Sequence, residues 1–326
     1  MNLLKSLFNN KWVKKLIKFA QREDKLLNSV NLNFVDKLAE QDKKTNRGRK
    51  RKYKLSKIFK LVIDGFRNGR TAATEIARFA QDILVKAKHE LDNNISHDTI
   101  SRFWIAVQSI IKKIFQKLVR HSQKLGIFYS GLSQVLDGTD IATRFLKDKD
   151  AKWNYDSTRK KYYFGYGLFI SVDPISQLPI AGFITEGKKV TKKESHKMLD
   201  DVMILLPSVI LGDPEFDVTD LVEKAMNKNI QFIAPYNARN AKPPLPIKYR
   251  AELYGFSRSW MREEIYLRAE VEHTFSTLKE HFHLLDFHVR GRKKVETHLL
   301  FVLCMRLIHG IATFKMGKSP RRITHL

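Results

Sequence analysis

The sequence predicts an α/β fold, in which a mixed central sheet is flanked by helices and preceded by an all-α N-terminal region. Apolar residues recur at steps of three and four between residues 55 and 126, which is the period of amphipathic helices. From residue 131 onward, short β-rich runs appear, first in succession and then in alternation with helical segments. Hydrophobic residues make up 43% of the 326, which is enough for a core and excludes a wholly disordered chain.

Residues 1–54 are predicted to form a basic helical arm and linker. Residues 1–60 contain 18 basic and 5 acidic residues, so they carry +13 of the net charge of +26. This excess predicts a polyanionic partner, with nucleic acid ahead of an anionic membrane surface. Apolar residues among the lysines of residues 1–40 indicate one or two amphipathic helices that pack on the protein itself; a helix lying on a membrane surface has the same pattern.

The linker at residues 43–54 carries the candidate DNA contacts Arg47, Arg49 and Arg51. An arginine–glycine–arginine run is typical of arms that enter a narrow minor groove, because glycine lets the backbone approach the DNA. A solvated linker without a groove contact is the alternative interpretation.

Residues 55–126 are predicted to form a helical DNA-binding domain. Ser96 is a good N-cap for a last long helix whose apolar positions run from Ile100 to Leu118. The first turn of this helix, residues 97–102, is polar, as in the recognition helix of a helix-turn-helix. A plain helical bundle is the alternative.

Residues 127–318 are predicted to form a catalytic domain, which a basic tail at 319–326 follows. Three antiparallel strands, then a helix, a strand, a helix and a strand, and finally two long helices give the mixed sheet. The strands are expected at 133–137, 163–172, 179–185, 208–211 and 231–234, and the helices at 192–206, 218–227, 262–285 and 293–314.

Two acidic residues directly follow apolar strands. Asp137 comes at the exit of the first strand and Asp213 at the exit of the fourth. In this strand order the first and fourth strands are neighbours at the sheet centre, so the two carboxylates are expected to face each other. Because like charges repel, a divalent cation is the usual partner of such a pair. Asp140 is the alternative to Asp137.

A third acid, Glu272, lies on a predicted helix beside the apolar stripe. At about 100° per residue, Arg268 and Glu272 are about 40° apart and Glu272 and Lys279 about 20° apart, so the three project from one face. A solvated face with an ion pair is the alternative interpretation.

Together these motifs resemble the DDE transposases of bacterial and archaeal insertion sequences, whose catalytic domain has a ribonuclease-H-like fold. The resemblance covers residues 136–314. The third motif matches the Tyr-Arg-Glu-Lys signature of one large group, except that the tyrosine is expected at Ile265 and Tyr266 is one position late. The motifs are Leu136-Asp137-Gly138-Thr139-Asp140, Gly212-Asp213-Pro214-Glu215-Phe216-Asp217, and Arg268-x3-Glu272-x6-Lys279.

The resemblance implies that Asp137, Asp213 and Glu272 are catalytic and hold two Mg²⁺ (or Mn²⁺) ions. Two metals stabilise the attacking and leaving oxygens when transposon ends are cleaved and joined to target DNA. It also implies that Arg268 and Lys279 contact phosphates, and that a dimer acts on double-stranded DNA, namely terminal inverted repeats and target. Two alternatives remain: an inactive or domesticated DNA-binding protein, and a structure-specific nuclease on the same fold.

A second basic turn follows the glutamate helix and is also predicted to contact phosphates. Its candidate residues are Arg290, Arg292 and Lys293.

The resemblance implies a prokaryotic, nucleoid-associated protein, and the remaining features predict a cytoplasmic one. The single cysteine, Cys304, cannot form an internal disulfide, which favours a reducing compartment. The first 20 residues have no unbroken apolar core of the kind found in signal peptides. The most apolar run, residues 299–305, ends at Arg306 and is too short to span a bilayer, so no membrane association is expected.

Overall fold

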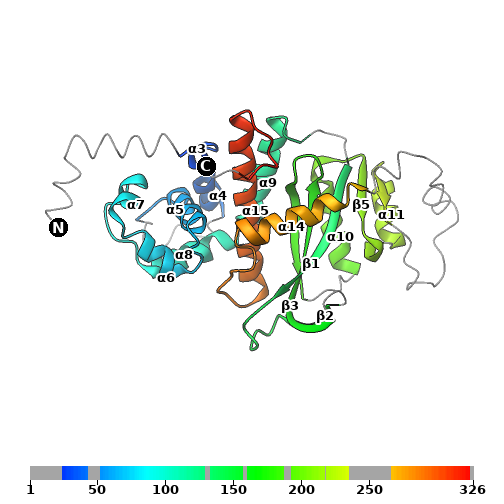
Figure 1. Cartoon of the computed structure of the whole chain (residues 1–326), viewed down its shortest axis with the longest axis horizontal. Coiled ribbons are helices and arrows are strands. Elements are labelled where there is room, and N and C mark those ends of the chain that lie inside the picture. Colours follow the sequence, from blue (N-terminus) through cyan, green and yellow to red (C-terminus); the bar gives the residue numbers. More distant parts are fainter. Residues whose placement is uncertain are drawn as a thin grey trace.

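The computed structural model describes residues 24–42, 52–128, 133–156, 160–186, 192–216, 218–234 and 266–323. The N-terminal helices gather at one end of the molecule and a sheet flanked by helices lies at the other (Figure 1). The long helix α15 (Arg292–Lys315) stands between them and packs on both. The α/β fold with helices ahead of a mixed sheet is therefore confirmed.

The N-terminal part contains seven helices among the described residues. As predicted, Ser96 caps α8, because its hydroxyl accepts the N–H of Thr99 at 3.3 Å. The single long helix expected after it is wrong: the helix breaks at residues 109–110, where the Ser109 hydroxyl donates to the Ala106 carbonyl and competes with the helical bonds. The helices are α3 (Lys25–Asn28), α4 (Phe34–Gln41), α5 (Leu55–Arg67), α6 (Ala73–Phe79), α7 (Ile83–Lys88), α8 (His97–Gln108) and α9 (Ile111–Lys124).

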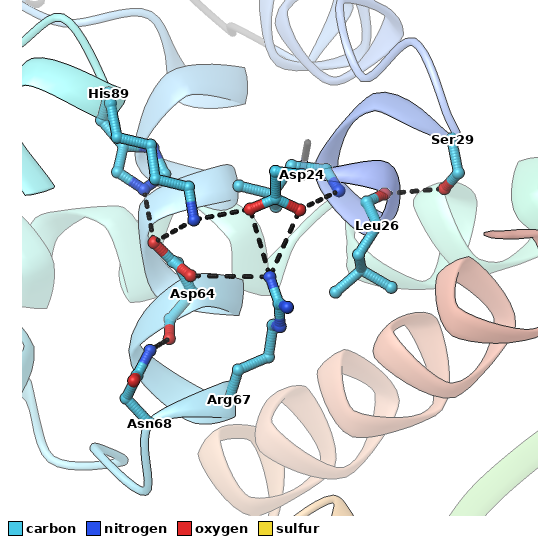
Figure 2. A network of polar contacts seen from close by, with 9 residues as sticks. Asp24, Leu26, Ser29, Asp64, Arg67, Asn68 and His89 are labelled. Atoms are coloured by element: carbon cyan, nitrogen blue, oxygen red, sulfur yellow. Dashed lines mark hydrogen bonds and ion pairs between the residues drawn. The ribbon is translucent and has the colours of Figure 1, made fainter. Parts of the chain in front are cut away.

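A buried ionic network holds three of these helices together. Figure 2 shows Asp24, which precedes α3, beside Asp64 and Arg67 of α5 and His89 at the end of α7. Lys88 lies 2.5 Å from Asp24 and 2.9 Å from Asp64, and His89 contacts Asp64 at 3.0 Å. Burial alone would raise the pKa of Asp64, but the contacts with His89 and Lys88 lower it overall. The start of the described chain is thereby fixed to the helical domain.

The sheet has the order β2-β3-β1-β5-β6, and β4 also pairs with β3. Strand β3 is antiparallel to β1, β2 and β4, whereas β5 and β6 run parallel to β1. Gly165 of β3 is paired with Ala142 on one edge and with Lys152 on the other, so β2 and β4 share the edge opposite β1. The strands are β1 (Ser133–Ala142), β2 (Lys152–Asp156), β3 (Lys161–Asp173), β4 (Leu178–Thr185), β5 (Val209–Gly212) and β6 (Gln231–Ile233).

Two differences from the expected strands affect the site. Strand β1 does not end at Asp137 but continues to Ala142, because β3 pairs with it along this whole length. Strand β2 was not expected, since it is only five residues long and its alternating aromatic and polar residues include no aliphatic one.

Helices cover both faces of the sheet. Alternate side chains of a strand point to opposite faces. Leu136 therefore faces α10 (Lys192–Val202) and α11 (Thr219–Met226), whereas Val135 faces the layer of α14 (Ala269–His281) and α15. By the same alternation, the residue after Leu136 faces α14 and α15. The expected helix at 262–285 corresponds to α14, and residues 262–265 lie outside the described part.

Helix α15 is the core helix of the protein. Among the described residues it is the one helix long and apolar enough to cross a membrane, but 94% of its most apolar stretch is buried inside the protein. The expectation that this stretch is too short was wrong, because the helix continues past Arg306; its burial in the core is what distinguishes it from a membrane span. Arg306 is 1% exposed, donates to the Pro320 carbonyl at 3.0 Å, and has its pKa lowered to about 9 by burial.

Candidate active site at the central strands

The two aspartates lie side by side where β1 and β5 meet. The parallel register pairs Leu136 with Gly212, so the next residues, Asp137 and Asp213, are also neighbours. Asp137 accepts the N–H of Gly138 at 2.7 Å, and Asp213 accepts the N–H of Glu215 at 2.8 Å. Both line a cleft of about 520 Å³, which we call the carboxylate cleft.

The pleat of β1 separates Asp137 from its alternative, Asp140. Asp137 and Thr139 face α14, and Lys279 of α14 donates to the Thr139 hydroxyl at 2.9 Å. Asp140 points to the opposite face of the strand, where it accepts the Tyr163 hydroxyl at 2.6 Å. Although both aspartates border the cleft, Asp137 is the one on the same face as Asp213 and α14.

Gly138 allows β1 to lie directly over an aromatic ring. A Cβ at this position would lie 2.6 Å from the Phe169 ring, closer than real side chains approach. Phe169 in turn stacks on Phe183, with ring centroids 5.2 Å apart. The Phe169 ring therefore packs directly against β1 at Gly138, the residue next to Asp137.

Helix α14 brings further charges to Asp137. Arg268 is the N-cap residue of α14 and Glu272 lies in its first turn. Both act electrostatically on Asp137: the charge of Arg268 lowers its pKa and that of Glu272 raises it. Lys279, further along the helix, lines the cleft itself. The three residues predicted to share one helix face thus lie along the side of α14 that meets β1.

The net effect on Asp137 is a pKa raised from 3.8 to about 6. Burial is the main cause, and the charges of Asp213 and Glu272 add to it, whereas the Gly138 N–H and Arg268 oppose it. A bound divalent cation would favour the ionised form and reverse this shift. The neighbouring side chains of Asp137 and Asp213 offer carboxylate oxygens, which is the donor chemistry of Mg²⁺ or Mn²⁺, so these two residues fit such an ion.

Glu272 is exposed in the first turn of α14, whereas the two aspartates are neighbours on adjacent strands. Within the described ranges, no group of three His, Cys, Asp or Glu side chains has the spacing of a metal site. Glu272 on α14 therefore does not complete a three-ligand group with Asp137 and Asp213 in this structure.

The predicted basic turn divides into two kinds of residue. Arg290 and Lys293 are exposed. Arg292 instead donates to the Ile184 carbonyl at 2.8 Å and to Glu194 at 2.8 Å, so its guanidinium connects the start of α15 to β4 and α10. Arg47, Arg49 and Arg51 lie outside the described residues, as does residue 265, while Tyr266 is 79% exposed.

Sequence reasoning missed two aspartates that hold the start of α15. Asp148 accepts the N–H of Gly291 at 2.8 Å and the Tyr166 hydroxyl at 2.7 Å, and Asp150 accepts the N–H of Arg292 at 2.8 Å. Burial would raise the pKa of Asp148, but these hydrogen bonds lower it overall. Acidic side chains at a helix N-terminus are favourable, but the helix that these two hold starts more than 140 residues later, so local sequence patterns do not reveal the contact.

Comparison with known proteins identifies the family. A family model described as "Transposase DDE domain" matches residues 132–308, more than half of the chain. Two proteins from strains of Halobacterium salinarum, each described as "Probable transposase for insertion sequence element ISH11", are 28% identical over 254 residues, which cover 75% of this chain and 76% of theirs.

Solved structures whose backbone partly resembles that of this chain are also of transposases. A piggyBac transposase synaptic complex with hairpin DNA has a TM-score of 0.45 at 10% identity, covering 92% of this chain and 75% of that chain. A Drosophila P element transposase strand transfer complex has a TM-score of 0.29 at 11% identity, covering 84% and 70%. On the match of the family model over residues 132–308, this chain belongs to the DDE transposase family.

Proposed function

We propose that this protein is the transposase of an insertion sequence, which cleaves the ends of the element and joins the freed 3′-hydroxyl to target DNA. The observation that carries the proposal is the position of Asp137 beside Asp213, on the sheet face covered by α14. The matched family and the description of the halobacterial relatives support the same reaction.

Asp137, Asp213 and Glu272 are the residues that would hold the divalent cations, two Mg²⁺ or Mn²⁺ ions in our proposal. When bound, the ions polarise the phosphodiester and lower the pKa of the attacking water or hydroxyl. The role of the aspartates is to stay ionised once the ions neutralise their mutual repulsion. Arg268 and Lys279, which flank them along α14, would bind the DNA phosphates, the first as a planar fork and the second as a point charge.

We assign the binding of terminal inverted repeats and target DNA to the whole basic surface, with a dimer holding two ends. In the helical domain at residues 55–126, the first turn of α8 is open to a partner, since the side chains of His97 and Asp98 are 59% and 64% exposed. The arm at residues 1–54 would add phosphate and groove contacts, and Arg290 and Lys293 would extend them beside the catalytic domain at 127–318. We place this activity at the nucleoid of a prokaryotic cytoplasm.

The test is cleavage and joining of the element's own end DNA in Mg²⁺ or Mn²⁺. We expect wild type to cut and join, and Asp137→Asn, Asp213→Asn and Glu272→Gln to bind the DNA without cutting it. Glu280→Gln is the matched control for Glu272→Gln, because Glu280 lies on the same helix with a 67% exposed side chain. Binding without cutting by wild type would favour the DNA-binding protein, and cutting without joining would favour the nuclease.

A further inference from the structure

Strand β2 and the first half of β3 form a two-stranded ribbon with four aromatic residues on one face. The antiparallel register places Trp153 opposite Phe164 and Tyr155 opposite Tyr162. The ring centroids of these pairs are 5.4 Å and 5.1 Å apart. Directly opposed residues, and residues two apart on one strand, share a face of the sheet, so the four rings form one surface, the aromatic ribbon.

Three of these rings are open to solvent. Trp153 is 65% exposed, Tyr155 is 48% exposed and Tyr162 is 72% exposed. The ribbon is nevertheless held in place, because Tyr163, on its other face, is 9% exposed and donates to Asp140 of β1 at 2.6 Å. A contiguous exposed aromatic surface on a fixed element is typical of a binding site.

The aromatic ribbon continues the face that carries the catalytic carboxylates. On β3, Tyr162 and Phe164 have the same parity as Ile170, which pairs with Asp137, so all four lie on one face of the sheet. Tyr162 also lines the carboxylate cleft together with Asp137 and Asp213. At about 3.3 Å per residue, Tyr162 lies no more than about 26 Å along the strand from Ile170, which corresponds to about eight base steps of DNA.

The charge around the aromatic ribbon suits a nucleic acid strand. Lys152 and Lys161 are exposed on the two strands and Lys160 directly precedes β3, whereas the ribbon carries one acid, Asp156; by strand alternation Lys152 and Lys161 lie on the opposite face of the ribbon from the rings. Aromatic rings and lysines on one element are the combination that binds single-stranded nucleic acid, since each base can stack on a ring while the long lysine side chains attract the phosphates. In a paired duplex the base faces are covered by their neighbours, so the rings match bases that have left the helix.

We propose that the aromatic ribbon stacks on unpaired bases of the DNA strand that passes through the carboxylate cleft. This inference rests on the proposed function, because it assigns a partner to a surface beside the same site. It predicts that ends with an unpaired flank bind more tightly than fully paired ends, and that the rings carry this difference.

The experiment compares two labelled duplexes of the element's end, one fully paired and one with a thymine overhang beside the cleaved phosphate, by fluorescence anisotropy. Trp153→Ala and Tyr162→Ala are each expected to weaken binding of the overhang duplex by about 5- to 150-fold more than binding of the paired one. Trp153→Phe and Tyr162→Phe keep a ring and should retain most of the difference. Ile175→Ala, a truncation of a 49% exposed side chain in the turn between β3 and β4, is the control and should match wild type.

Equal weakening on both duplexes, or no weakening, would overturn the inference. A change of oligomeric state in the alanine variants, with the overhang preference intact, would also overturn it and would assign the aromatic ribbon to a protein contact. In each of these outcomes wild type would still cleave paired ends, so the proposed function would stand. The proposed function itself would fail if wild type never cut such ends.

Discussion

Replacing Asp137 with Asn is predicted to stabilise the metal-free protein above pH 6 and to leave its stability near pH 4 unchanged. The native pKa is raised from 3.8 to about 6, so between these values the native state holds a proton that the unfolded chain has released. The free energy of unfolding therefore falls as the pH rises through this interval. At 1.36 kcal/mol per pKa unit, the loss is about 3 kcal/mol by pH 7. Asn is neutral at every pH, so the variant does not lose this free energy of unfolding. Its side-chain oxygen still accepts the Gly138 N–H.

The assay is urea unfolding in the presence of a chelator at a series of pH values from 4 to 8. The difference between variant and wild type should be near zero at pH 4 and reach about 3 kcal/mol by pH 7. Asp98→Asn, which changes a 64% exposed side chain, should show a flat and small difference. Added Mg²⁺ should stabilise wild type more than Asp137→Asn, because the variant lacks a ligand. A pH-independent difference for Asp137→Asn would refute the reasoning, since Asp137 would then titrate like an ordinary surface carboxylate.

Three further predictions concern the fold. Asp64→Ala should destabilise the protein by about 3–5 kcal/mol in urea unfolding, because it removes a buried carboxylate that contacts Lys88 and His89; a loss below 1 kcal/mol would contradict the role of this network. Gly138→Ala should cost about 1–3 kcal/mol, because the new Cβ meets the Phe169 ring, and an unchanged unfolding midpoint would show that the ring moves freely. Cys304 is buried and its pKa is raised, so a thiol reagent should react with it in urea but not in the native protein; rapid native labelling would argue against the closed core.

The pair of aspartates was predictable because each follows an apolar strand, and parallel neighbours bring their ends together. The choice between Asp137 and Asp140 was not settled by the same reasoning. The two are three residues apart, so they point to opposite faces once β1 continues to Ala142. That continuation depends on pairing with β3, a contact between distant parts of the chain that local patterns do not contain.

The features missed by sequence reasoning have a common physical cause. Strand β2 is short and has no aliphatic residue, and it exists because β3 offers it a partner edge. Likewise, Asp148 bonds to Gly291 and Arg292 bonds to Glu194, and these contacts join residues more than 90 positions apart, which local patterns do not reveal. The break between α8 and α9 was hidden because apolar spacing continues through it; a serine hydroxyl that bonds to the backbone interrupts the helix there.

The most direct test of the central claim, that the acids on the α14 face carry the reaction, is single-turnover cleavage of end DNA by Asp137→Asn and Asp140→Asn measured side by side. Loss of a metal ligand removes several kcal/mol of transition-state stabilisation, so Asp137→Asn is predicted to cut about 10³-fold more slowly. Asp140→Asn, which alters the partner of Tyr163 on the opposite face, should stay within about tenfold of wild type. Normal cleavage by Asp137→Asn, with loss of cleavage in Asp140→Asn, would contradict the account.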